Sequence, residues 1–228
     1  VAALTMSLIA IFLTQYLSYL PITTLSAIII SASIGLFNLD YLKRLYKVSR
    51  SEFGLALLTS LSVITIGVIP AVMFAVSLSL FRLLARSSSP PDAVLGKVEE
   101  TNSYHNVEDF ENIKTYPGLL IYRFDSALLF FNSDYFLGRA KQKIKEQKEA
   151  VRYFLLAAGP ANYLDITAAD ALIDFSKELR QEGIQLGIAD AKAGIRAMIA
   201  FSGLEECIGS ENLFETIDAG VEQFLKSK

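Results

Sequence analysis

The chain has 228 residues, 52% of them apolar, a formal net charge of −3 and one cysteine. An acidic balance disfavours nucleic acid as a partner, because phosphate binding requires a basic surface. A single cysteine excludes an internal disulfide, and the lone His105 has no neighbouring His or Cys with which to form a metal site.

The charged residues divide the chain into two parts. Residues 1–39 carry no charge, and residues 1–86 carry eight charges that sum to +4. Residues 87–228 carry the other 37, which sum to −7. We therefore expect membrane helices over 1–86, a Ser/Pro-rich linker over 87–92 and a water-soluble domain over 93–228.

The uncharged run at the start is long enough for two membrane spans. As one helix it would be about 58 Å long, whereas the hydrocarbon core of a bilayer is only about 30 Å thick. Pro21 marks the expected break, because proline is tolerated in a first helical turn, and the predicted spans are about 2–20 and 22–37. No basic segment precedes the run, so we expect a piece of a longer membrane protein rather than a signal peptide.

A short basic stretch, 40–52, follows these spans. Its apolar side chains recur on one helical face, and Lys43, Arg44, Lys47 and Arg50 occupy the rest. We interpret it as an ordinary interfacial helix in contact with membrane lipid, rather than a specific lipid-binding site. The positive-inside rule predicts that it is cytoplasmic.

A second uncharged run, 53–81, ends at Arg82 and Arg86. A break near Gly67 and Pro70 predicts two short spans, about 53–68 and 70–86, which leave both basic edges in the cytoplasm. One tilted span is the alternative, and it would place residues 87–228 on the other side of the membrane. None of the predicted spans contains a charged residue in its interior, so this region shows no transport site of its own.

The soluble half alternates strand and helix patterns. Helices are predicted after Asn132 or Ser133 as a cap, from about residue 168 to Gly183, near Ile195, and at the C-terminus. Strands separated by such helices predict an α/β domain with a mostly parallel sheet and helices packed on it. The expected strands are 93–98, 118–124, 127–131, 151–157 and 184–189.

Motifs in both halves resemble, in order, the sulfate permease (SulP) family of anion transporters. In the soluble half, AVLGKV at 93–98, PGLLIYRFD at 117–125 and LFFN at 129–132 resemble its STAS domain. In the apolar half, LP at 20–21 and RLYKVSR at 44–50 resemble the family's last membrane spans. The resemblance covers nearly the whole chain.

The resemblance implies a fold of two inverted repeats of seven membrane segments, the last four of them in residues 1–86, followed by a cytoplasmic STAS domain. It implies a multi-pass, homodimeric, secondary active transporter of the inner or plasma membrane. Its substrate would be an inorganic anion of the sulfate or bicarbonate class, bound between half-helices upstream of Val1. The alternative is a membrane-tethered STAS signalling adaptor without transport activity.

The loop and helix start at 162–170 is the candidate site for regulation or for a cytoplasmic protein partner. Related anti-sigma-factor antagonists carry Asp-Ser-Ser-Gly here, with the second serine phosphorylated. The resemblance places Asp165 at the aspartate, Thr167 at that serine and Ala168 at the glycine, while Ile166 replaces the first serine. As local structure, Thr167 and Asp170 form a Thr-x-x-Asp capping box, with Asp165 beside the same helix start.

The sequence gives no sign of an enzyme. It contains no nucleophile–base pair, no set of metal ligands and no glycine-rich motif that could hold a nucleotide phosphate. We therefore predict no catalytic activity and no cofactor.

Overall fold

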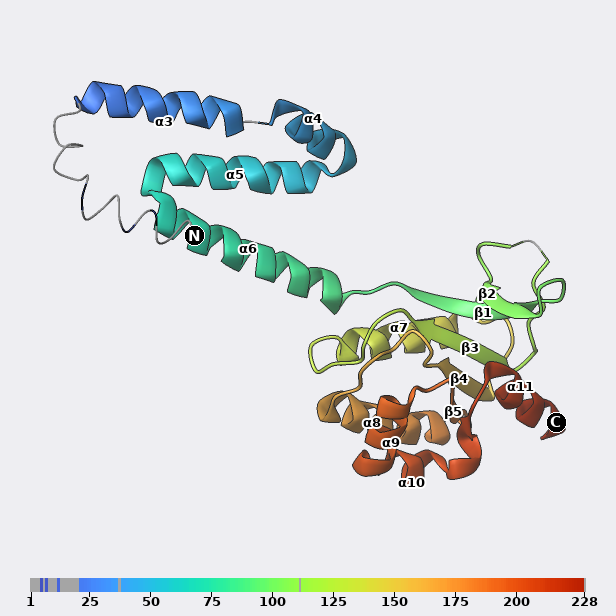
Figure 1. Ribbon diagram of the computed structural model, residues 1–228. Helices are drawn as coiled ribbons and strands as arrows, with labels where there is room; N and C mark the ends of the chain where they lie inside the picture. The colour runs from blue at the N-terminus through green and yellow to red at the C-terminus, as the bar shows by residue number, and fades with distance from the viewer. Residues whose placement is uncertain are drawn as a thin grey trace. The chain divides into compact units, whose positions relative to one another are not determined.

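Figure 1 shows the chain as a computed structural model, with a helical first region followed by an α/β domain. The structure describes residues 21–36, 38–110 and 112–227, together with Thr5, Ser7 and Phe12. The predicted span over 2–20 therefore lies almost wholly outside the described residues. The chain divides into two compact units, Val1–Leu78 and Ser79–Lys228.

Capping residues and a glycine set the ends of the helices in the first region. Asn38 accepts a hydrogen bond from the Tyr41 backbone N–H, and Ser49 accepts one from Glu52. Gly67 adopts a φ of 86° between two helices, and Pro70 lies in the first turn of the second, where its missing N–H costs no hydrogen bond. The described helices are α3 (Ile22–Leu36), α4 (Leu39–Val48), α5 (Arg50–Ile66) and α6 (Val68–Ser88).

These bounds change two details of the expected arrangement. The basic stretch 40–52 is divided at Ser49, because that side chain caps α5. Helix α6 continues to Ser88, two residues into the expected linker, and the Ser88 hydroxyl donates to the Leu84 carbonyl. Among the described residues, α6 is the one helix long and apolar enough by itself to cross a membrane. Helices α3 and α4, which are bent by 45° relative to each other, pass the same test of length and composition as a pair. The four-span arrangement stays a prediction.

The second region is built on a six-stranded sheet in the order β2-β1-β3-β4-β5-β6. Strands β3 to β6 pair in parallel, whereas β1 is antiparallel to both β2 and β3. The predicted α/β class with a mostly parallel sheet is confirmed. The strands are β1 (Asp92–Val98), β2 (Ser103–Asn106), β3 (Leu119–Phe124), β4 (Tyr153–Ala157), β5 (Gln185–Ala189) and β6 (Leu213–Phe214).

Helices cover both faces of this sheet (Figure 1). Successive residues of a strand point to opposite faces, so Leu120 and Phe154 enter one core while Leu119 and Tyr153 enter the other. Helices α7 to α10 pack on the first core, and α11 packs on the second. The helices are α7 (Ser133–Lys145), α8 (Ile166–Gln181), α9 (Ala193–Ser202), α10 (Leu204–Ile208), the 3₁₀ helix η1 (Ser210–Asn212) and α11 (Ile217–Lys226).

The predicted strand over 127–131 is wrong. Leu128 makes a single parallel bridge to Leu164, and the chain then turns into α7. The turn forms because the Asn132 side-chain oxygen accepts a hydrogen bond from the Leu129 N–H at 2.9 Å. Strand β2 was not predicted; it returns along β1 after a turn in which Asn102 adopts a φ of 50°, a conformation that asparagine tolerates well.

Candidate functional site

The candidate site lies where the chain leaves β4 and enters α8. Asp165 occupies the N-cap position in extended backbone conformation, and its Oδ1 accepts a hydrogen bond from the Ala168 N–H at 2.8 Å. This bond satisfies one of the N–H groups that a first helical turn leaves without a partner. The start of α8 is therefore fixed by Asp165.

The prediction that Thr167 caps this helix, with Asp170 completing the capping box, is wrong. Both residues lie inside α8 and their side chains are exposed. Aspartate caps a helix at least as well as threonine, and the Asp165 carboxylate has a second oxygen with which to bind another element. The buried Ala168 packs in the core below them, 1% exposed.

The second carboxylate oxygen connects α8 to the β3–α7 loop, residues 125–132. Asp165 Oδ2 accepts from the Phe130 N–H at 2.8 Å. Two backbone bonds run alongside, from the Leu128 N–H to the Tyr163 carbonyl at 3.0 Å and from the Asp165 N–H to the Leu128 carbonyl at 3.1 Å. Loop and helix start are thus held together by three hydrogen bonds.

Three apolar side chains stand exposed on the segments that meet here. Phe130 is 67% exposed, Tyr163 57% and Ile166 47%. Among the described residues, no group of three or more His, Cys, Asp or Glu side chains is arranged to hold a metal ion. The segments thus present apolar groups to solvent beside a capped helix start.

Asn132 lies where the sequence predicts a helix cap, but its side chain binds other groups. It holds the N-cap position of α7 but makes no side-chain cap hydrogen bond. Instead its Nδ2 donates to the Ala127 carbonyl at 3.0 Å and to the Ser87 carbonyl in the last turn of α6 at 3.3 Å. A wholly buried side-chain amide requires hydrogen-bond partners, so its burial indicates such a network. The local sequence does not identify those partners.

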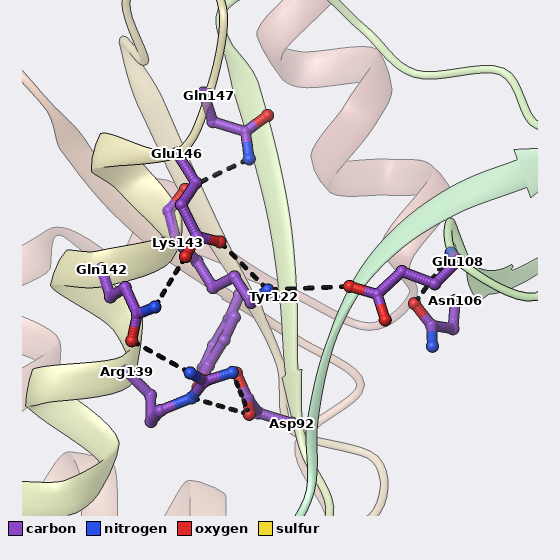
Figure 2. A network of polar contacts seen from close by, with 9 residues as sticks. All are labelled: Asp92, Asn106, Glu108, Tyr122, Arg139, Gln142, Lys143, Glu146 and Gln147. Carbon is purple, nitrogen blue, oxygen red and sulfur yellow. Dashed lines mark hydrogen bonds and ion pairs between the residues drawn. The ribbon is translucent and has the colours of Figure 1, made fainter.

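A second polar network fixes the first strand of the sheet to α7, as Figure 2 shows. Arg139 Nε and Nη2 both lie 2.9 Å from Asp92 Oδ1, and the Tyr122 hydroxyl donates to Asp92 Oδ2 at 3.1 Å. Burial, and then the Asp92 carboxylate, raise the pKa of Tyr122, while the hydrogen bond to Asp92 raises the pKa of Arg139. Tyr122 therefore keeps its proton and donates it in the hydrogen bond to Asp92.

A surface groove of about 530 Å³ lies at the other end of α8. Arg180, Gly183, Cys207 and Glu211 are among its lining residues. The Arg180 guanidinium donates to the Cys207 carbonyl at 2.5 Å, which ties α8 to α10. The groove is separate from the helix start that carries Thr167.

Two family models match the chain, in sequence order. The sulfate permease family model matches residues 1–59, and the STAS domain model matches residues 111–220. The first match falls in the charge-poor helical region, and the second covers β3 to the start of α11.

Several curated proteins align over nearly the whole chain. A Mycobacterium tuberculosis protein described as a probable sulfate transporter is 34% identical over 96% of this chain and 39% of its own length. Sulfate transporter 1.1 of Arabidopsis thaliana is 30% identical over 97% of this chain and 35% of its own length. The chain thus spans less than two fifths of the relatives it matches.

The solved structure of the murine solute carrier 26 family member A9 anion transporter, in its inward-facing state, has a similar fold. It superposes with a TM-score of 0.78 over 90% of this chain and 33% of the other, at 20% identity. The similarity extends over both the helical region and the α/β domain.

Proposed function

This chain belongs to the sulfate permease family, and on that premise we propose that it is part of a secondary active anion transporter. In this role it joins membrane helices of the gate or scaffold to a regulatory STAS domain. The observation that carries the proposal is the presence of both matched regions, permease and STAS, in order on one chain.

The permease match favours a transporter over a membrane-tethered signalling adaptor. An adaptor needs only an anchor before its STAS domain, whereas residues 1–59 match the permease model itself. The curated relatives that align over more than nine tenths of the chain are described as sulfate transporters. We propose an inorganic anion of the sulfate or bicarbonate class as the substrate.

The proposed placement has residues 1–86 in the membrane, 87–92 as the linker and 93–228 as a cytoplasmic STAS domain. It is supported by the +4 charge of the first part, whose cations lie at the ends of the apolar runs. We further propose a homodimer within the lipid bilayer. Helix α3 carries no charged residue, and the charges of α5 and α6 lie in the first turn or the last two turns of those helices. We therefore place the anion site in other parts of the transporter.

The transport proposal is tested with the complete gene product that contains this chain, reconstituted into proteoliposomes. Uptake of labelled sulfate and of labelled bicarbonate is followed against protein-free vesicles, with excess unlabelled anion as competitor. We expect competitor-sensitive uptake of at least one of the two anions. Absence of uptake for every anion tried contradicts the proposal.

We also propose that the start of α8, with Asp165, Thr167, Ala168 and Asp170, is the regulatory site and binds a cytoplasmic partner. The exposure of Thr167 and Asp170 and of the nearby apolar side chains supports this role. Thr167→Glu should change the transport rate, whereas Thr167→Ala should leave folding intact because Asp165 supplies the cap. Equal transport by wild type and both variants contradicts a regulatory role.

A further inference from the structure

We propose that the β3–α7 loop couples the start of α8 to the last turn of α6. This inference rests on the proposed function and deepens it. It names the route by which a change at the regulatory site reaches a helix long enough to cross a membrane. The coupling itself is a property of hydrogen bonds within residues 79–228, and it can be measured without transport.

The loop binds the chain near both ends of the linker. On the α6 side, Asn132 Nδ2 donates to the Ser87 carbonyl, which belongs to the last helical turn and therefore has no partner within the helix. On the β1 side, the Asp125 N–H donates to the Pro91 carbonyl at 3.0 Å. The position of the linker thus depends on the conformation of residues 125–132.

The same loop depends on Asp165. Its carboxylate uses one oxygen for the Ala168 N–H and the other for the Phe130 N–H, both at 2.8 Å. Asn132 then fixes the loop internally, by accepting from the Leu129 N–H and donating to the Ala127 carbonyl. A series of hydrogen bonds, joined through the Leu129–Phe130 backbone, therefore runs from the start of α8 to Ser87.

The series has a strong end and a weak end. The two bonds to the Asp165 carboxylate are short and charge-assisted, which makes them strong. The bond from Asn132 to Ser87 is 3.3 Å, at the long limit for an N–H to oxygen bond. A displacement of the loop should therefore release the α6 end first, while the STAS core remains folded.

The exposed groups at the strong end offer a means of displacing the loop. Thr167 lies two residues after Asp165, so an acidic group placed there repels the carboxylate. The Phe130 ring is exposed, although the backbone N–H of the same residue is bound to Asp165. A partner that packs on the ring can therefore displace Phe130 and lengthen this hydrogen bond. Either event acts directly on the contact between loop and helix.

The test is amide hydrogen exchange on the full chain in lipid nanodiscs, with Asp165→Ser as the main variant. Serine keeps the helix cap but is too short to reach Phe130 as well, so the cap and the coupling are separated. We expect exchange of the amides in 128–132 and in 85–88 to accelerate by about 3- to 10-fold, the effect of losing one hydrogen bond. Exchange at Ala168 should stay within about twofold of wild type.

Two further variants complete the test. Asn132→Asp keeps the acceptor for Leu129 but removes both donors, and it should accelerate exchange in 85–88 while leaving the start of α8 unchanged. Thr216→Ala, the matched control, removes the α11 cap and its bond from the Ala219 N–H, and should affect α11 alone.

The proposal is overturned if Asp165→Ser accelerates exchange in 128–132 but not in 85–88, or if Asn132→Asp leaves 85–88 unchanged. Should Asn132→Asp fail to fold, Asp165→Ser alone still decides between coupling and its absence. A positive exchange result together with unaltered transport by Thr167→Glu would contradict the regulatory role and leave the coupling standing.

Discussion

The STAS domain buries most of its large apolar side chains, whereas the helical region leaves most of its own exposed. In the STAS domain the large aromatic residues Phe136, Phe154 and Phe175 are at most 1% exposed. In the helical region Ile22 and Ile64 are more than 80% exposed, and the described side chains of α3 to α6 include one that is fully buried, Ala71. The STAS fold is thus determined by its own packing, whereas the helices leave an apolar surface that lipid or further protein segments must cover.

The largest expected difference comes from placing the same charge at one exposed apolar position in each region. Val76, near the middle of α6, is 53% exposed, and Phe201 on α9 is 84% exposed. We expect Val76→Lys to cost about 3 to 4 kcal/mol of membrane insertion, because lysine at the centre of a span is disfavoured. Phe201→Lys should change the stability of the STAS domain by less than about 0.5 kcal/mol.

A translocon insertion assay on α6 measures the first substitution, and chemical unfolding followed by near-ultraviolet circular dichroism measures the second. If Val76→Lys inserts as well as wild type, the exposed surface of α6 is not covered by lipid and the comparison fails.

Within the STAS domain, the next largest effect should come from the buried ion pair. Asp92 has a side chain only 5% exposed, so Arg139→Met leaves a buried carboxylate without its cationic partner. We expect a loss of about 3 kcal/mol in the free energy of unfolding, at the lower end for a buried pair because Arg139 is 28% exposed. The matched control is Lys141→Met, which breaks an exposed pair with Glu178 and should cost less than about 1 kcal/mol.

Urea unfolding of both variants measures this difference. Equal losses for Arg139→Met and Lys141→Met would show that burial of Asp92 does not matter, and would remove the network of Figure 2 as a determinant of stability.

A smaller loss of stability should distinguish Asp165 from Thr167 as the residue that caps α8. Asp165→Ala should lower the free energy of unfolding by about 1 to 2 kcal/mol, because the cap and the bond to Phe130 are both lost. Thr167→Ala should change it by less than about 0.5 kcal/mol, because its side chain is exposed and does not cap the helix. The reverse order in urea unfolding would restore Thr167 as the cap.

The smallest effect concerns the pH dependence of the contact between β1 and α11. The hydrogen bond from Lys97 to Asp218, at 2.6 Å, lowers the pKa of Asp218 below its ordinary 3.8 and raises the pKa of Lys97 above its ordinary 10.5. Asp218 therefore adds stability above pH 3.8 that disappears as the pH falls through its folded-state pKa. Lys97 adds stability below pH 10.5 that disappears as the pH rises through its own folded-state pKa.

Unfolding of wild type and Asp218→Asn at a series of pH values checks this contact. The difference between them should be constant between the two ordinary pKa values and vanish in acid. A difference that persists at low pH would mean that the carboxylate charge is not its source.

Local patterns were sufficient to predict most of the STAS domain. Strands β3, β4 and β5 are apolar runs, and α8 shows a helical repeat that ends before Gly183, so periodicity alone located them. The segment 127–131 reads as a strand by the same criterion. It becomes a turn because the Asn132 side chain binds Leu129, a contact that periodicity does not encode.

The candidate site was only partly predictable for a related reason. The resemblance directed attention to Asp165 and Thr167, and α8 begins at Ile166, two residues before the expected start. The division of roles between them depends on Phe130, which is 35 residues away from Asp165, and the role of Asn132 depends on Ser87, 45 residues away. Partners at such separations are set by the tertiary fold.

The two ends of the STAS sheet constrain how two copies of the protein can associate. The outermost strands, β2 and β6, have only four and two residues. Strands this short offer few free backbone groups to a strand from another molecule, which is one way in which proteins avoid edge-to-edge aggregation. The proposed dimer should therefore be held by side-chain contacts rather than by pairing of sheet edges, and its two sheets should remain separate.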